Sequence, residues 1–344
     1  MEGLRRVLWN SWSKGLHAVI IVTGATGFIG SNIVADLNAA GRDDIILVDN
    51  LGTQSKWKNI AKRRFQDFVL PSEVDALLRK LSGADVVYHM GANSSTTSTD
   101  GDAILLSNFR ASQAWWEWCS ATRTPFIYAS SAATYGDGAG GFADDQARDA
   151  LDALRPLNLY GWSKHAFDKW AVGRHAMGNQ PPQWCGLKFF NVYGPNENHK
   201  ADMRSLVSKN TAAVAAGQSI ELFKSYRPEF ADGQQKRDFV YVKDCTRVML
   251  WLASRPGVSG LYNLGTGMAR SFADLMQAVG AALGKSVSIE FIDMPPSIRA
   301  NYQYFTEAQM SKLRGAGYGE SFVSLEIGVA DYVREYLMRA DTYR

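Results

Sequence analysis

The sequence has few of the features that mark disulfide-rich, metal-binding or membrane-spanning proteins. Only Cys119, Cys185 and Cys245 are cysteines, and no two of them form a CxxC pair, which excludes a disulfide framework and a cysteine-based zinc site. No apolar run reaches the roughly 18 residues that a membrane-spanning helix needs. Lys and Arg exceed Asp and Glu by only three, 37 against 34. This near balance does not favour a nucleic-acid-binding protein.

Histidine spacing and the N-terminal residues exclude two more classes. His17, His165 and His175 are not spaced with an acid or a cysteine as metal ligands are, so no metal site is expected. Residues 1–17 have basic residues but neither an apolar core nor a small-residue cleavage site. They are therefore expected to be an N-terminal extension rather than a secretory signal. These absences predict a soluble, cytoplasmic, globular protein that binds neither nucleic acid nor a membrane.

Apolar runs alternate with helical patterns in the first half of the chain. A helix is expected at 31–40 and another at 108–121. Four runs are typical of strands buried on both faces of a parallel sheet: 18–23, 44–49, 85–89 and 124–130. This alternation predicts an α/β fold, a doubly wound parallel sheet of Rossmann type. Later elements are expected as strands at 186–191, 238–242 and 287–292, helices at 244–254, 271–283 and 324–339, and an exposed loop at 224–236.

A glycine turn, Gly24-Ala-Thr-Gly27-Phe-Ile-Gly30, joins the first expected strand to the first expected helix. Glycines let a backbone approach a pyrophosphate, and a helix N-terminus offers free N–H groups and partial positive charge. Asp49 ends the next strand, 19 residues after Gly30, where an acid can accept hydrogen bonds from an adenosine ribose. The pattern predicts a dinucleotide-binding site.

Two neighbouring features favour different cofactors. Asp49 by itself favours NAD. The segment 56–64 carries five positive charges, and its Lys56 is the residue best placed to hold the 2′-phosphate of NADP. A charge run of this kind is more often a solvated helix face, and composition does not separate the two interpretations. The prediction is NADP, with NAD as the alternative.

A second motif, Tyr160-Gly-Trp-Ser-Lys164, places a phenol and an ammonium one helical turn apart. A tyrosine with an ordinary pKa of about 10 is a weak base near neutral pH, and a fixed cation beside it favours the phenolate. Ser131 ends a predicted strand and can donate a further hydrogen bond to a reacting oxygen. YxxxK spacing alone occurs by chance in many helices, but here it accompanies the glycine turn and Ser131.

Together these motifs resemble the extended short-chain dehydrogenase/reductases that act on nucleotide sugars. Within that group the sequence is similar to the ADP-L-glycero-D-manno-heptose 6-epimerases from about residue 18 to its last residue. The segments that carry this narrower resemblance are Ser94-Ser-Thr-Thr97, Phe189-Phe-Asn-Val-Tyr-Gly-Pro195, His199-Lys200, Lys236-Arg-Asp-Phe-Val-Tyr-Val242 and Tyr302-Gln-Tyr-Phe-Thr306.

The resemblance implies inversion of C6″ of ADP-D-glycero-D-manno-heptose through a transient ketone, with bound NADP taking and returning a hydride. Tyr160 and Lys200 would be bases on opposite faces of the carbon. Lys164 would anchor the nicotinamide ribose and polarise Tyr160, and Ser131 would steady the oxygen. The family also implies a place in lipopolysaccharide biosynthesis and a homo-oligomer, a pentamer.

Binding residues and domains follow from the same resemblance. The cofactor would contact Gly24, Gly27, Phe28, Ile29, Gly30, Asp49, Asn50, Lys56, Met90, Gly91, Ala92, Asn93, Ser94, Ser107 and Lys164. The ADP-sugar would contact Asn191, Val192, Asp202, Lys209, Phe223, Lys224, Arg237 and Tyr302. A cofactor domain would span 18–188 and be re-entered at about 237–267 and 302–315, and 189–344 would be mainly the substrate-binding domain.

Two other functions share some of these motifs. A C4 epimerase or 4,6-dehydratase of another nucleotide sugar would also use the glycine turn and the Tyr–Lys pair. Dehydratases of this superfamily generally carry an acid pair after the strand end, where Ala132 and Ala133 stand here. A non-catalytic dinucleotide sensor would usually lack the tyrosine or the lysine. Met90, Ser107, Asp202 and Lys209 differ from the residues usual in the family, which leaves the exact nucleotide sugar open.

Overall fold

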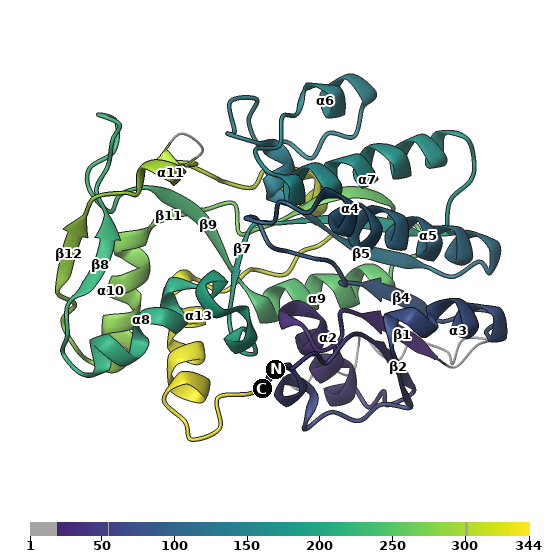
Figure 1. The fold of residues 1–344 in the computed structure, drawn as a ribbon, viewed down its shortest axis with the longest axis horizontal. Coiled ribbons are helices and arrows are strands. Elements are labelled where there is room, and N and C mark those ends of the chain that lie inside the picture. The colour runs from purple at the N-terminus through teal and green to yellow at the C-terminus, as the bar shows by residue number, and fades with distance from the viewer. Residues whose placement is uncertain (1–18, 54, 300–301) are drawn as a thin grey trace.

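The structure of the chain is a computed structural model, and it describes residues 19–53, 55–299 and 302–344 (Figure 1). The predicted N-terminal extension, residues 1–17, lies outside the described residues. Within the described residues, no helix combines the length and the apolar character needed to cross a membrane.

A seven-stranded parallel sheet lies at the centre of the larger part of the molecule (Figure 1). Its order is β10-β6-β5-β4-β1-β2-β3. The order reverses between β1 and β4, and ligands of doubly wound folds bind at the carboxyl ends of the strands beside such a reversal. The predicted Rossmann-type α/β fold is confirmed. The strand bounds are β1 Ile20–Thr23, β2 Ile45–Val48, β3 Asp67–Val69, β4 Val86–His89, β5 Phe126–Ser131, β6 Trp184–Phe189 and β10 Gly260–Leu264.

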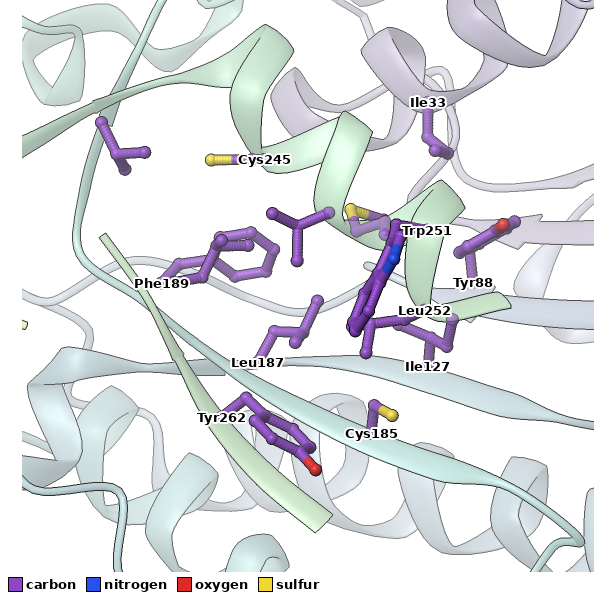
Figure 2. Close-up of a cluster of buried hydrophobic side chains, with 14 of the residues drawn as sticks. Ile33, Tyr88, Ile127, Cys185, Leu187, Phe189, Cys245, Trp251, Leu252 and Tyr262 are labelled. Carbon is purple, nitrogen blue, oxygen red and sulfur yellow. The ribbon is translucent and has the colours of Figure 1, made fainter. Parts of the chain in front are cut away.

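Helices cover both faces of this sheet, which is why its central strands are apolar without alternation. On one face pack α2 (Phe28–Ala39) and α9 (Val242–Ala253), and Figure 2 shows Trp251 and Leu252 of α9 against Leu187 and Ile127 of the sheet. On the other face pack α5 (Ala111–Ala121) and α7 (Leu159–Ala176), with Trp116 fully buried among their aromatic rings.

The smaller part of the molecule contains two small sheets and three helices around a core of its own. One sheet has the order β11-β9-β7, and the other pairs β12 with β8. The strands are β7 Asn191–Tyr193, β8 Ile220–Phe223, β9 Lys236–Tyr241, β11 Ala269–Ser271 and β12 Ile289–Ile292. The helices are α8 Leu206–Ala215, α10 Phe272–Leu283 and α13 Leu325–Tyr332.

Short helical segments connect these elements. The α-helical ones are α3 Val74–Lys80, α4 Gly101–Ile104, α6 Arg148–Ala153, α11 Pro296–Arg299 and α12 Ser311–Gly315. The 3-10 segments are η1 Ser55–Ile60, η2 Pro71–Glu73, η4 Ala132–Tyr135 and η5 Asn198–Met203. Two π-helical segments are η3 Leu105–Arg110 and η6 Val333–Leu337.

Several predicted boundaries are wrong for identifiable reasons. The helix expected from residue 31 begins at Phe28, so Gly30 lies inside its first turn rather than in the preceding loop. The strand expected at 186–191 ends at Phe189, and the chain then leaves the large sheet to form β7 in a small one. The final helix, expected to Arg339, is α13 followed by the π-helical turn η6. The loop expected at 224–236 joins β8 to β9, whose first residue is Lys236.

Candidate active site

The glycine turn after β1 packs so closely that side chains would not fit. Gly24 has a φ of +63°, and a Cβ there would lie 2.6 Å from the backbone nitrogen of Gly91. A Cβ on Gly30 would overlap the carbonyl oxygen of Gly24. The missing side chains leave the first N–H groups of α2 accessible at the carboxyl edge of the sheet. Such a cradle suits a pyrophosphate.

Asp49 holds this turn from the end of β2. Its Oδ2 accepts hydrogen bonds from the backbone nitrogen of Thr26 at 2.9 Å and from Thr26 Oγ1 at 2.7 Å. Its Oδ1 accepts from the backbone nitrogen of Asn50 at 2.8 Å and from Lys56 Nζ at 2.6 Å. The predicted ribose-binding acid and the predicted phosphate-binding lysine are therefore paired with each other.

A buried histidine joins the glycine turn to the loop after β4. His89 Nδ1 lies 2.7 Å from Thr23 Oγ1, and its Nε2 lies 2.9 Å from Ser112 Oγ. Thr23 Oγ1 also accepts a hydrogen bond from the backbone nitrogen of Gly91 at 3.0 Å. Burial, together with the positive charge of Lys164, lowers the pKa of His89 to about 3. His89 is therefore neutral near pH 7 and fixes the loop rather than carrying protons.

The Tyr–Lys pair lies in the first two turns of α7, which begins after the capping residue Asn158. Asn158 Oδ1 accepts a hydrogen bond from the backbone nitrogen of Gly161 at 2.8 Å. Burial raises the pKa of the Tyr160 phenol, and its hydrogen bond with Ser131 opposes that shift. Burial lowers the pKa of Lys164 to about 8, and only 3% of this residue is exposed. Both groups therefore lie where neighbouring charge strongly affects their proton affinity.

Lys200 reaches the same region from η5. Its Nζ lies 5.2 Å from the ring centre of Phe28, the first residue of α2. Glu197 is fully buried and accepts hydrogen bonds from the backbone nitrogen and the Oγ of Ser205, both at 2.6 Å. This closes the segment 197–205 into a fixed loop. Burial lowers the pKa of Lys200, and the charge of Glu197 opposes that shift.

His199, beside Lys200, links this loop to the cofactor end. Its Nδ1 lies 3.1 Å from Asn59 Nδ2, and Asn59 also donates to the carbonyl oxygen of Thr26 at 2.8 Å. Burial, followed by the charges of Lys56 and Lys200, lowers the pKa of His199 to about 4. The ring is therefore neutral near pH 7.

These segments line one cavity of about 610 Å³. Among the described residues, its lining includes four basic side chains and one carboxylate, that of Asp49. The basic side chains are those of Lys56, Lys164, Lys200 and Arg204. A cavity with this balance suits ligands that carry several phosphates. The predicted site residues in its lining are Gly24, Gly27, Phe28, Ile29, Gly30, Asp49, Lys56, Met90, Gly91, Ala92, Ser94, Ser131, Tyr160, Lys164, Asn191, Val192 and Lys200.

Other predicted cofactor residues lie outside this lining. Ser107 Oγ donates to the carbonyl oxygen of Ala103 at 2.8 Å, within its own helical segment. Its neighbour Asn108 is fully buried and exchanges hydrogen bonds with the backbone of Asn93 at 2.8 and 2.9 Å. Asn108 rather than Ser107 therefore holds the loop after β4. Asn50 follows Asp49 and is exposed.

Several predicted substrate residues also lie outside it. Asp202 and Lys209 are exposed, and Lys224 Nζ lies 3.4 Å from Asp293 Oδ1 at the surface. Phe223, Arg237 and Tyr302 form a cluster of their own. The Arg237 guanidinium lies 5.2 Å from the Tyr302 ring centre, and the Phe223 and Tyr302 ring centres are 6.3 Å apart.

The Arg237 cluster adjoins the cavity through Phe272. The Arg237 guanidinium lies 5.5 Å from the ring centre of Phe272, which belongs to the cavity lining. Arg237 Nη1 donates to the carbonyl oxygen of Lys236 at 2.9 Å, and burial lowers its pKa. The three residues therefore border the site without lining it.

Sequence reasoning missed part of the cavity wall. Arg204 lines the cavity next to α8, and its Nε donates to the carbonyl oxygen of Ala201 at 3.0 Å. Aromatic and aliphatic lining residues come from β6, β7, α8, β9 and α10. No spacing signal marks these residues, although Phe189, Phe190, Tyr193, His199 and Phe239 lie in segments that carried the resemblance. The missed residues are Ala129, Ser130, Phe189, Phe190, Tyr193, His199, Met203, Arg204, Ser205, Leu206, Phe239, Phe272 and Leu275.

Known proteins are similar to this chain in sequence and in fold. The model of the NAD dependent epimerase/dehydratase family matches residues 20–265, which include the glycine turn, the Tyr–Lys pair and Lys200. The chain belongs to the NAD dependent epimerase/dehydratase family. As a member of this family it is an epimerase-type enzyme with a Rossmann sheet.

Relatives within the NAD dependent epimerase/dehydratase family narrow the comparison. An ADP-L-glycero-D-manno-heptose-6-epimerase of Nitratidesulfovibrio vulgaris (strain DP4) is 48% identical over 336 residues, covering 94% of this chain and 99% of that protein. The crystal structure of Helicobacter pylori ADP-L-glycero-D-manno-heptose-6-epimerase has a TM-score of 0.75 at 25% identity, covering 92% and 95%. A Thermus thermophilus UDP-glucose 4-epimerase in complex with NAD has a TM-score of 0.69 at 25% identity, covering 90% and 96%.

The residues of this chain fit the dinucleotide that the family uses. Backbone atoms of Gly24 and Gly91 approach so closely that no Cβ fits between them, and Gly30 opens the start of α2. Asp49, Lys56, Tyr160 and Lys164 line the same cavity as this turn. The closely packed glycine turn and the basic side chains of the cavity therefore fit a ligand that carries a pyrophosphate.

Proposed function

We propose that this chain inverts C6″ of ADP-D-glycero-D-manno-heptose, giving ADP-L-glycero-D-manno-heptose, with bound NADP. One observation carries the proposal: Tyr160, Lys164 and Lys200 line a single cavity with the glycine turn. Two candidate bases on different segments in one cavity suit a reaction that must serve both faces of one carbon. The 48% identity to an ADP-L-glycero-D-manno-heptose-6-epimerase over 94% of the chain supports this substrate.

In this proposal the chain's own residues move and hold protons while the cofactor, when bound, accepts and returns the hydride. Tyr160 takes or gives a proton at its phenol oxygen on one face of C6″, and Lys200 does so at Nζ on the other. Lys164 stabilises the Tyr160 phenolate and orients the nicotinamide ribose. Ser131 donates to the reacting oxygen. Burial favours the neutral form of Lys200, which a proton acceptor must have.

The ADP-sugar is proposed to extend from these bases past Asn191 and Val192. Arg204 lines the cavity and supplies positive charge to it, whereas Asp202 and Lys209 are exposed and lie outside the lining. Arg237 and Tyr302 border the cavity beyond Phe272, where the diphosphate and base would lie. We also propose that the enzyme works in the cytoplasm as a homo-oligomer, as the resemblance implies.

The direct test is incubation of the purified enzyme with ADP-D-glycero-D-manno-heptose. We expect inversion at C6″, followed by NMR as the appearance of the L-glycero epimer, with no net change in cofactor oxidation state. UDP- and dTDP-hexoses serve as competing substrates. Turnover of one of these with no conversion of the ADP-heptose would replace the proposal by a C4 epimerase or dehydratase.

The cofactor proposal has its own test at Lys56. We expect the enzyme to retain NADP rather than NAD, because Lys56 of η1 lines the cavity 2.6 Å from Asp49, beside which a ribose 2′-phosphate would lie. Cofactor released by denaturation is identified by mass spectrometry. Lys56→Ala should reduce the NADP-to-NAD ratio, by about tenfold for the loss of one charge-assisted contact, whereas Lys58→Ala, outside the cavity lining, should not. Recovery of NAD alone from the unaltered enzyme would contradict this prediction.

A further inference from the structure

A buried ion pair lies behind the Tyr–Lys pair. Asp168 belongs to α7 and Lys188 to β6, and Lys188 Nζ lies 2.9 Å from Asp168 Oδ2. The two side chains are 0% and 1% exposed. Burying two charges is costly, and nothing in the fold of a parallel sheet requires a lysine near the end of a fully buried strand. The pair therefore calls for an explanation beyond stability.

Asp168 connects four elements at the carboxyl end of the sheet. Its Oδ1 accepts from the Tyr128 hydroxyl at 2.9 Å, and its Oδ2 accepts from Ser130 Oγ at 2.7 Å. Both partners belong to β5. Through Lys188, which donates to Thr134 Oγ1 at 2.8 Å, the carboxylate also reaches η4. The Asp168 side chain of α7 thus contacts β5 and β6 directly, and it is linked to η4 through Lys188.

The anchored positions are those that adjoin the proposed catalytic residues. Ser130 immediately precedes Ser131, and Ser130 itself lines the cavity. Asp168 follows Lys164 by four residues and Tyr160 by eight, so the three lie on one face of α7. A shift of α7 along β5 would therefore change the distance between Ser131 and Tyr160.

We propose that Asp168 is a positioning residue: its carboxylate locks the end of β5, with Ser131, against the helix that carries Tyr160 and Lys164, and provides the counter-charge of the Lys164 ammonium. This inference rests on the proposed function, because it assumes the proposed roles of Tyr160, Lys164 and Ser131. It assigns a role to a residue that lies outside the cavity lining. Lys188, which is also outside the cavity lining, is the buried ion-pair partner of Asp168.

The charged and titratable groups around Asp168 favour this division of roles. From other elements, Asp168 is faced by Lys188 of β6, Tyr128 of β5 and Tyr135 of η4. On its own helix, the titratable groups near it are those of Tyr160, Lys164 and His165. Lys164 is faced from β4 by His89, which burial keeps neutral near pH 7. Within the described residues, Asp168 is the acid whose charge acts on both Tyr160 and Lys164.

The sign of the effect follows from these charges. Burial lowers the pKa of Lys164 to about 8, and the Asp168 carboxylate raises it against that shift. The same carboxylate raises the pKa of Tyr160. Neutralising Asp168 should therefore lower both pKa values. Tyr160 and Lys164 would then deprotonate at a lower pH than in the unaltered enzyme, and both limbs of the pH–rate profile would shift to lower pH.

The experiment compares Asp168→Asn with Asp152→Asn. Asp152 is an exposed acid of α6 that pairs with Lys169 of α7, so it is a control acid that contacts the same helix at the surface. For Asp168→Asn we expect kcat to fall about tenfold or more and KM to change little. The alkaline limb of the pH–rate profile should shift to lower pH by about one unit, which is the smaller end of the effect of an adjacent opposite charge. Asp152→Asn should match the unaltered enzyme. A slower Asp168→Asn enzyme with an unmoved pH profile would reduce Asp168 to a structural role and overturn the inference.

Two further measurements keep the test decisive. Asp168→Leu/Lys188→Met removes both charges without leaving one unpaired, so it replaces Asp168→Asn if that variant does not fold. The pKa of Lys164 is measured by NMR of lysine labelled at Cε, with Lys164→Met for assignment, and should fall in either variant. This readout needs no turnover. Failure of the unaltered enzyme to convert the ADP-heptose would contradict the proposed function. An unchanged pKa of Lys164 in the variants would contradict this inference.

Discussion

Lys200→Met should leave less than about one thousandth of the C6″ inversion rate while the cofactor stays bound, since loss of a general acid–base group typically costs 10²- to 10⁴-fold. The reason is geometric. Tyr160 extends from α7 and Lys200 from η5, so the two groups enter the cavity from different segments. One of them cannot serve both faces of a carbon in a fixed site. Methionine keeps most of the length and apolar contact of the lysine beside Phe28 but has no proton to exchange.

The matched variant on the other face is Tyr160→Phe, which should cause a loss of similar size for the same reason. Inversion is followed by NMR, and cofactor content by its absorbance after denaturation. Lys285→Met, a change at an exposed lysine after α10, serves as the control and should retain full activity. Normal turnover by the Lys200→Met enzyme would contradict the two-base mechanism and leave Tyr160 as the sole base.

Gly30→Ala should abolish stable cofactor binding. The added methyl group would overlap the carbonyl oxygen of Gly24 and lie 3.0 Å from the Cα of Ala25. Both neighbours are backbone atoms of the glycine turn itself, so relief requires the turn to move rather than a side chain to rotate. The N–H groups at the start of α2 would then no longer converge on one pyrophosphate. We expect cofactor affinity to fall by more than about 100-fold and the free energy of unfolding to fall by about 1–3 kcal/mol, as for other overpacked sites.

Gly140→Ala provides the comparison, because nothing lies within 4 Å of a Cβ at that position. It should bind cofactor like the unaltered enzyme. Bound cofactor per chain after purification and the midpoint of thermal unfolding are the two measurements. A Gly30→Ala enzyme that retains stoichiometric cofactor would show that α2 does not supply the pyrophosphate site.

The sheet was predictable from local patterns. β1, β2 and β4 are short, mostly apolar and buried throughout, and such strands belong to parallel sheets covered on both faces. The shorter strands β3 and β11 carry too few residues for a pattern to identify them. The split between β6 and β7 was also not predictable, because the chain changes sheets there without a change in composition.

The candidate site divides in the same way. The turn at Gly24–Gly30 and the Tyr160–Lys164 pair are local: each is one segment whose spacing decides its geometry. Residues from separate segments are different. Ser107 and Asn108 are adjacent in sequence, yet burial and hydrogen bonds to Asn93 make Asn108 the one that holds the loop. Asp202 and Arg204 stand two residues apart in one loop, and only Arg204 lines the cavity.

By itself the sequence determined the parallel sheet, the dinucleotide turn and a tyrosine–lysine pair on one helical face, because the repeats of strand and helix are local properties of the chain. Only the tertiary structure decided that Lys200 shares a cavity with that pair, that Lys56 is paired with Asp49, and that Asp168 is buried behind Lys164. These relations depend on which distant segments pack together, and packing sets both the distances between charges and their removal from water.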